Sequence, residues 1–216
     1  MNVIAAAALF CLYALLIACV EIEIEGAHGW ADRLPTWYRV SGPLARLYFL
    51  VSGGRPLTGY HVTMIPALFL SFHLAFALGR DWSLVAELQV LAIWAVWVAL
   101  WDAIWFFFNP AYGLAGFRPG QVWWHPKWLG PVPSAYVVGV AGSLLLAGIA
   151  AILADSLGLF TDQLILVSVF LGFAVVCVLL APLYMKLYRH THSADFDQRD
   201  RVAITQPPQP SDHTAD

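Results

Sequence analysis

The stretch LVAELQVLAIWAVWVALWDAIWFFF, residues 84–108, determines which class of fold this chain can adopt. Only Glu87 and Asp102 carry charge within it. A helix of this length rises about 37 Å at ~1.5 Å per residue, which exceeds the ~30 Å hydrocarbon core of a bilayer. Because lipid offers no partner to backbone N–H and C=O groups, a helix that satisfies them internally is expected. The stretch therefore predicts a transmembrane helix.

Four further apolar runs accompany this one. The five expected spans are residues 2–20, 60–78, 84–108, 135–153 and 164–185. The whole chain agrees, because 60% of its 216 residues are hydrophobic, 12% are charged, and its mean hydropathy is +0.70. The sequence predicts an all-α, polytopic integral membrane bundle of about five transmembrane helices over residues 1–189, and a disordered polar cytoplasmic tail over residues 190–216.

The basic residues predict the orientation. Ten of the eleven follow the first, third or fifth span: Arg33, Arg39, Arg46, Arg55, Arg118, Lys127, Lys186, Arg189, Arg199 and Arg201. Only Arg80 lies on the other side. The positive-inside rule makes the richer side cytoplasmic, with the N-terminus and the loop at residues 155–162 outside and the C-terminus inside. We expect a multi-pass protein of the cell membrane, most simply the bacterial inner membrane, with an uncleaved first helix because no Lys or Arg precedes it.

The first cytoplasmic loop contains its own helix signal. Pro43 follows Ser41, apolar residues recur at helical spacing through Leu50, and Gly53-Gly54 comes next. Pro at the first helical position and Gly after the last are typical of a short helix. With Arg46 among its apolar residues, we expect this helix to lie in the membrane interface.

The stretch EIEIEGAHGW, residues 21–30, is the most informative polar segment. If the first helix continues through it, Glu21 and Glu25 lie one turn apart on one face, and Glu23 points elsewhere. Two adjacent carboxylates in a partly desolvated place need a cation, a shared proton or a metal ion. The alternative is that all three are solvated charges at the membrane boundary.

Asp102 is the second polar signal, because it lies inside an apolar span. A carboxylate at the centre of a transmembrane helix costs about 2.5–3.5 kcal/mol on insertion scales, so such residues are usually functional. Helical spacing places Trp105 and Asn109 on the same face. The alternative is a structural Asp that hydrogen-bonds to another helix.

Three histidines are expected at the same cytoplasmic depth as these carboxylates: His28, His61 and His125. Together with Glu25 and Asp102 they would suit a divalent metal ion, or they would carry protons. No regular ligand motif is present, and a lone interfacial His is more often a hydrogen-bonded anchor. Convergence of these groups in one cytoplasmic pocket is therefore predicted from their depth alone.

A second polar set lies in the outer half and consists of His73, Asp81 and Glu87. Glu87 and Asp102 are separated by about 22 Å along a helix, so they belong to different sites. The sequence does not assign roles to His73 and Glu87.

Three functions remain open at this point. The leading hypothesis is an enzyme that acts on a lipid or another lipophilic substrate, with Glu21, Glu25 and Asp102 as catalytic carboxylates. The alternatives are a proton- or ion-coupled transporter, and a noncatalytic subunit that binds a partner protein, a pigment or a quinone. Membrane lipids are the expected partners, and a homo-oligomer or a partner subunit stays open. The net charge of −3 and the lack of a Lys/Arg tract exclude nucleic acid.

Overall fold

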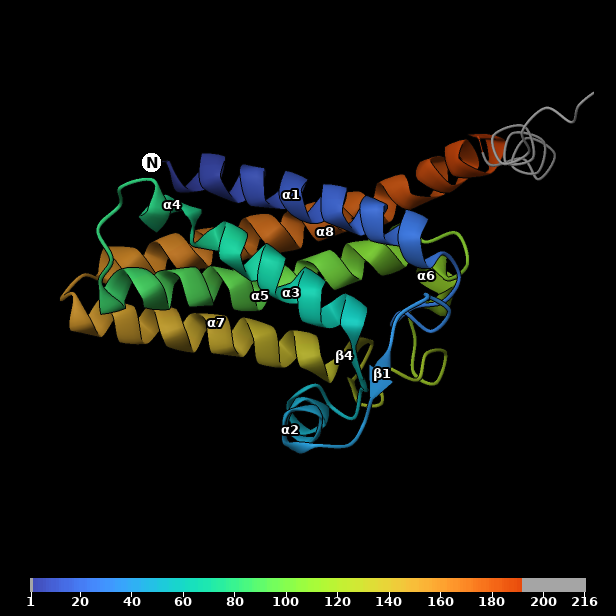
Figure 1. The fold of residues 1–216 in the computed structure, drawn as a ribbon. Coiled ribbons are helices and arrows are strands. Elements are labelled where there is room, and N and C mark those ends of the chain that lie inside the picture. The colour runs from blue at the N-terminus through green and yellow to red at the C-terminus, as the bar shows by residue number, and fades with distance from the viewer. Residues whose placement is uncertain (1, 192–216) are drawn as a thin grey trace, which may run out of the picture.

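The computed structural model describes residues 2–191 and is mostly helical over that range. Four of its helices are long and apolar enough to cross a membrane: α1 (Val3–Glu25), α5 (Leu84–Phe108), α7 (Ser134–Leu153) and α8 (Leu157–Thr191). They run side by side as a bundle (Figure 1). The predicted helical membrane fold is confirmed at this level.

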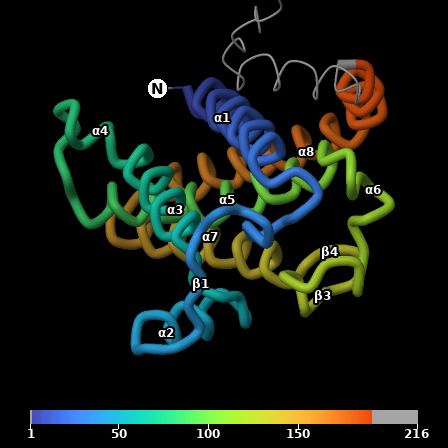
Figure 2. The backbone as a smooth tube through the Cα atoms, turned by 45° about the vertical axis from the view of Figure 1, so that its right-hand side comes forward, coloured from blue at the N-terminus to red at the C-terminus, as the bar shows by residue number. Residues whose placement is uncertain are grey.

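Helix α5 occupies the centre of the bundle. It packs against α1, α7 and α8, and the rotated view in Figure 2 agrees. Its buried side chains include Trp97, Ile104 and Phe106. The contact with α7 is close at Gly139, where an added Cβ would lie 2.7 Å from the carbonyl oxygen of Ala95. Small residues at this position allow the two helix backbones to approach.

The outward faces of the bundle are apolar as well. Leu9 on α1, Leu145 on α7 and Leu179 on α8 are each more than 60% exposed. Apolar side chains at this density on an outer surface are typical of a protein that contacts lipid.

The second predicted span, residues 60–78, differs from its prediction. The chain forms α3 (Gly59–Phe72), turns at His73 and forms the short α4 (Leu74–Ala77). Fourteen helical residues rise only about 21 Å, less than the bilayer core. The described residues therefore contain four long apolar helices rather than five.

Other boundaries shift as well, and α8 ends at Thr191 instead of residue 185. α1 continues through Glu25 instead of ending at residue 20, and α7 begins one residue earlier than predicted. α8 begins at Leu157, so most of the predicted outer loop at residues 155–162 is helical. Its 35 residues rise about 52 Å, and α8 extends beyond the bundle (Figure 1). The predicted disordered tail lies outside the described residues from position 192 onward.

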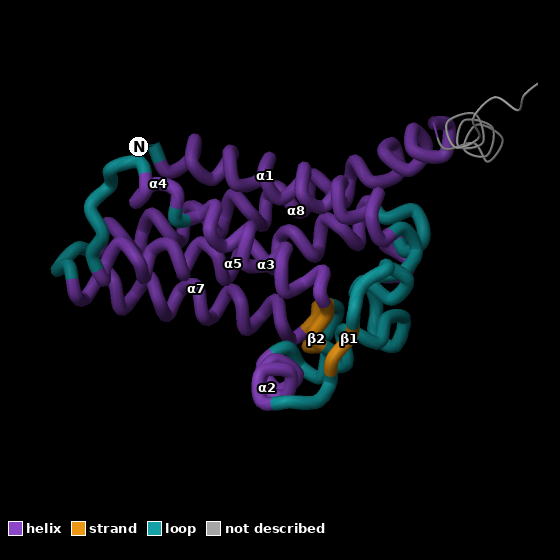
Figure 3. Tube along the Cα trace, in the orientation of Figure 1, coloured by secondary structure: helices purple, strands orange, loops and turns teal. Residues whose placement is uncertain are grey.

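One end of the bundle, here termed the loop end, gathers the connecting segments (Figure 3). They include α2 (Pro43–Val51), α6 (Gly113–Gly116) and two small antiparallel pairs. The pairs are β1 (Tyr38–Arg39) with β2 (Leu57–Thr58), and β3 (Trp128–Leu129) with β4 (Val132–Pro133).

Helix α2 agrees with the helix expected after Ser41. Pro43 opens it as predicted, and Gly42 is the N-cap residue, at φ 95°.

Candidate functional site

A cavity of about 470 Å³, the main cavity, lies inside the loop end of the bundle. Its walls come from α1, α3, α5, α7 and the loops, and α2 contributes Tyr48 and Val51. Five residues predicted for the site line it: Glu21, Glu25, His61, Asp102 and His125. His28, also predicted, does not line this cavity.

The last turn of α1 brings two carboxylates to the main cavity. Glu21 and Glu25 are 8% and 7% exposed, whereas Glu23 between them is exposed. The helix ends at Gly26, whose N–H donates to the Ile22 carbonyl and whose φ is 58°. Glycine adopts this left-handed conformation without a steric cost, so the helix can stop directly after Glu25.

His61 enters the cavity from the first turn of α3. The Thr58 hydroxyl oxygen accepts a hydrogen bond from the His61 backbone N–H at 3.1 Å and lies 2.7 Å from its Nδ1. The Trp30 ring stacks on the imidazole with a centroid distance of 4.1 Å. These contacts fix the ring, and one ligand atom each from His61, Glu21 and Glu25 lies within 4.8 Å of the other two.

The two glutamates have few partners. The Ala31 N–H donates to Glu25 Oε1 at 2.6 Å, and the Tyr60 hydroxyl makes a long contact of 3.4 Å with Glu21 Oε1. Across residues 2–191, no Lys or Arg forms a salt bridge with either carboxylate. Two buried carboxylates are thus held close together, and no Lys or Arg among the described residues compensates a negative charge on either.

Asp102 belongs to a second polar cluster at the main cavity. Its Oδ2 accepts hydrogen bonds from His125 Nε2 at 2.9 Å and from the Tyr136 hydroxyl. The Asp102 side chain is 31% exposed, and because it lines the main cavity, that surface faces the cavity. His125 is 3% exposed.

Arg55 fixes the tautomer of His125. Its Nη2 lies 3.1 Å from His125 Nδ1, and since a guanidinium only donates, Nδ1 must accept. The proton of a neutral His125 is therefore on Nε2, where it is donated to Asp102. Arg55 also donates through Nε to the Trp124 carbonyl at 2.6 Å, and its guanidinium lies 4.4 Å from the Trp30 ring centroid. Burial lowers the pKa of the Arg55 guanidinium, and the negative charge of Asp102 opposes that shift.

Two indole N–H groups at the cavity have no acceptor. Trp101 and Trp105 both line the cavity and are 7% and 3% exposed. The Nε1 of each is buried without a hydrogen-bond partner among the described residues. The Trp101 indole interacts with the Glu21 carboxylate without forming a well-aligned hydrogen bond. An indole N–H is a donor only, and an unsatisfied buried donor is costly.

Asn109, which the sequence places on the same helix face as Asp102, has a structural role. Its Nδ2 donates to the Gly26 carbonyl at 2.7 Å, and the Tyr112 hydroxyl donates to the Ala27 carbonyl at 2.8 Å. These bonds connect the end of α5 and the segment after it to the end of α1, which holds the glutamates beside α5.

The structure adds three residues that sequence reasoning missed: Trp30, Arg55 and Tyr136. Arg55 is one of four basic residues in its loop, and only its contacts distinguish it. A Tyr near the start of a span, such as Tyr136, is typical of the aromatic belt at a membrane interface. No local signal in the sequence separates these residues from their neighbours.

A different polar cluster lies at the other end of the bundle. His73 Nε2 contacts Glu87 Oε1 at 3.0 Å, and Trp82 Nε1 donates to Glu87 Oε2 at 3.1 Å. Both carboxylate oxygens of Glu87 therefore have a partner.

Comparison of the chain with protein-family models, with curated proteins and with solved structures gives no match. Any function is accordingly inferred from the geometry of the cavity.

Proposed function

We propose that the protein is a membrane enzyme that acts on a lipid or another lipophilic substrate in the main cavity. The observation that carries this proposal is the composition of the cavity, whose lining combines an apolar wall with buried carboxylates and histidines. The apolar wall consists of Ile65, Trp94, Ala95, Val98 and Ala99. A volume of about 470 Å³ lies in the range of small-molecule sites, which combine an apolar lining with a few polar groups.

A second cavity supports an amphiphilic substrate. It measures about 310 Å³ and shares Ser52, Arg55 and His125 with the main cavity. Lys127 and Ser134 add polar groups to its lining. A lipid with its apolar part against the α5 wall would place its polar headgroup in this second cavity, beside the two basic side chains.

The glutamate pair and the Asp102 cluster would have different roles in the reaction. Glu21 and Glu25 are positioned to hold a proton or a cation beside the reacting atom, because both are buried at the cavity wall. Asp102 orients His125 and Tyr136, and both of these residues also line the cavity. General acid–base catalysis requires such paired groups within hydrogen-bond reach of the substrate.

The interior between the two polar ends argues against a proton or ion path. Trp97 is fully buried, stacks on Trp94 and packs against Phe72 and Tyr13. These aromatic side chains separate the His73–Glu87 pair from Asp102 along α5. This favours the enzyme over the transporter, and it makes Trp97 core packing rather than part of a pigment surface.

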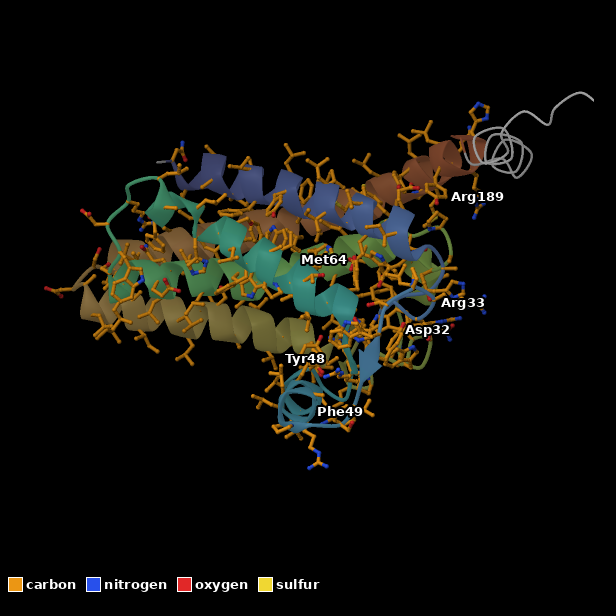
Figure 4. The ribbon with its side chains drawn as sticks, in the orientation of Figure 1. Asp32, Arg33, Tyr48, Phe49, Met64 and Arg189 are labelled. Carbon is orange, nitrogen blue, oxygen red and sulfur yellow. The ribbon has the colours of Figure 1, made fainter. Side chains whose placement is uncertain are left out.

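The orientation proposed from the sequence places the loop end in the cytoplasm of the cell. Arg33 and Arg189 lie at the same end of the bundle (Figure 4), and Arg80 follows α4 at the other end. The positive-inside rule supports this orientation. A fluorescent protein fused after Asp216 should fold and fluoresce. A dark fluorescent fusion, together with an active periplasmic phosphatase fused at the same position, would show that the proposed orientation is wrong.

Comparing the lipids of cells that express matched variants tests the proposed activity. We expect wild-type protein and Glu23→Gln, which changes an exposed carboxylate on the same helix turn, to produce the same change in the lipid profile. Glu25→Gln should abolish that change although the protein is inserted at normal levels. Two negative results together would contradict the proposal. The lipid profiles of all three strains would match that of the empty-vector strain, and the purified wild-type protein would leave a lipid extract supplied as substrate unchanged.

A further inference from the structure

We infer that Glu21, Glu25 and His61 bind a divalent metal ion at the wall of the main cavity. The inference rests on the cavity proposed above as the active site. The three side chains come from two helices, and one ligand atom of each lies within 4.8 Å of the other two. A metal ion placed among them would meet two carboxylate oxygens and one imidazole nitrogen.

The local charge favours a dication. Glu21, Glu25 and Asp102 contribute three carboxylates to one cavity, and Arg55 is the one Lys or Arg among the described residues that line it. Arg55 is committed to the Asp102 cluster, where it donates to His125 and to the Trp124 carbonyl. A divalent ion at the glutamates would balance the remaining charge, which burial otherwise makes costly.

His61 is held as metal-binding histidines usually are. Its Nδ1 lies 2.7 Å from the Thr58 hydroxyl oxygen, which can accept both this N–H and the His61 backbone N–H. When Nδ1 carries the proton, the lone pair of Nε2 is free to bind a metal ion. A hydrogen bond at the second ring nitrogen fixes the tautomer and the ring orientation of such ligands.

The unpartnered indoles are an independent sign that this site takes a ligand. Trp101 and Trp105 are more than nine-tenths buried and line the cavity, and within residues 2–191 neither Nε1 donor forms a well-aligned hydrogen bond. The Trp101 donor interacts with Glu21 itself. A water molecule or a substrate oxygen on the metal ion would supply the acceptor that these donors lack.

The donor set indicates a first-row transition dication such as zinc, manganese or iron. Magnesium and calcium prefer oxygen ligands alone, whereas imidazole suits zinc, iron and related ions. Three protein ligands leave positions for water or substrate, as in catalytic zinc sites. An ion held there would polarise a substrate oxygen or lower the pKa of its bound water.

Metal content after purification tests the inference directly. We expect elemental mass spectrometry to find about one metal ion per chain in the wild-type protein. Glu21→Gln and His61→Ala should lose it, whereas the matched controls Glu23→Gln and His28→Ala should retain it. If His61→Ala does not fold, Thr58→Val provides a milder variant that keeps all three ligands, and its metal affinity should fall about 10- to 100-fold.

Wild-type protein that stays metal-free after incubation with zinc, manganese or ferrous salts would overturn the inference, and so would equal metal content in Glu21→Gln. Lipid turnover is measured separately from metal content. A metal-free protein that turns over lipid contradicts the metal site alone, whereas a metal-loaded protein without turnover contradicts the proposed function alone.

Discussion

The two ends of the bundle use the same kinds of polar residues in different ways. At one end, Glu87 has one carboxylate oxygen on His73 and the other on Trp82, and the ion pair is partly exposed. At the loop end, Glu21 and Glu25 are buried side by side, and no Lys or Arg within residues 2–191 pairs with either. A cluster whose hydrogen bonds and charges are satisfied needs nothing further, whereas a pair of buried carboxylates without such partners indicates a ligand or a reaction.

Asp102 should give the largest effect of any single substitution. Asn keeps the size and one acceptor oxygen but removes the charge, so Asp102→Asn should lower turnover by about 10²- to 10⁴-fold in a folded, inserted protein. Ala leaves the donors of His125 and Tyr136 without an acceptor, so Asp102→Ala should also lose about 1–3 kcal/mol of stability. Turnover and thermal unfolding in detergent measure the two effects.

Glu87→Gln at the opposite end is the matched control for Asp102→Asn, because both remove one carboxylate from α5. It should leave turnover unchanged. A fully active Asp102→Asn protein would remove Asp102 from the site and leave only the glutamates of α1.

Arg55→Lys should introduce a pH dependence that the wild-type protein lacks. Arg55 contacts His125, Trp124 and Trp30 through a planar group, and a Lys ammonium cannot make the same set of contacts. Burial lowers the pKa of Arg55, but a guanidinium still stays protonated. A Lys there starts from a pKa of about 10.4, and burial lowers it further. Because the site requires a positive charge at this position, turnover by the Arg55→Lys variant should fall as the pH rises.

The measurement for Arg55→Lys is a pH–rate profile, in which the variant should lose activity on the alkaline side at a pH where wild-type protein is still active. Arg46→Lys on α2, where the side chain is exposed, should follow the wild-type profile. Superimposable profiles of all three proteins would mean that Arg55 does not hold His125 during the reaction.

Filling the apolar wall should have a smaller effect, on substrate binding. Ile65 on α3 lines the cavity, and Ile65→Trp would occupy part of the space proposed for the apolar chain. We expect KM to rise about tenfold, equivalent to ~1.4 kcal/mol of lost binding, with little change in kcat. Val62→Trp, three residues earlier on an exposed face of α3, is the control. A rise in KM for Val62→Trp as large as for Ile65→Trp would place the substrate elsewhere.

How far the sequence predicts this structure depends on the range of the interactions. Residues 84–108 form α5 with the predicted bounds, because the length of an apolar run between polar ends is a local property. The span at 60–78 was overestimated because hydropathy does not detect the turn at His73. The pairing of Glu21 with Glu25 also follows from local helical spacing.

The remaining site residues could be assigned to the site only from the three-dimensional structure. His61, Asp102 and His125 line the cavity, whereas His28, for which the sequence predicts the same depth, does not. Depth places a residue along the membrane normal but does not say which way its side chain points. Arg55, like Tyr136, enters the site through long-range contacts across the bundle, which no spacing rule in the sequence encodes.

The smallest effect is expected at the His73–Glu87 pair. Both side chains are more than 20% exposed, and partly exposed ion pairs contribute about 0–1 kcal/mol because solvent screens them. His73→Ala, Glu87→Gln and the double variant form a double-mutant cycle, and we expect a coupling energy below ~1 kcal/mol from thermal or denaturant unfolding, with lipid turnover unchanged in all three. The aromatic contacts of Trp97 with Trp94 and Phe72, which lie between Glu87 and Asp102 along α5, are the physical reason for this independence. Loss of turnover in either single variant would show that the two ends are coupled. Proton flux in liposomes that disappears in the same variants would then favour the transporter over the enzyme.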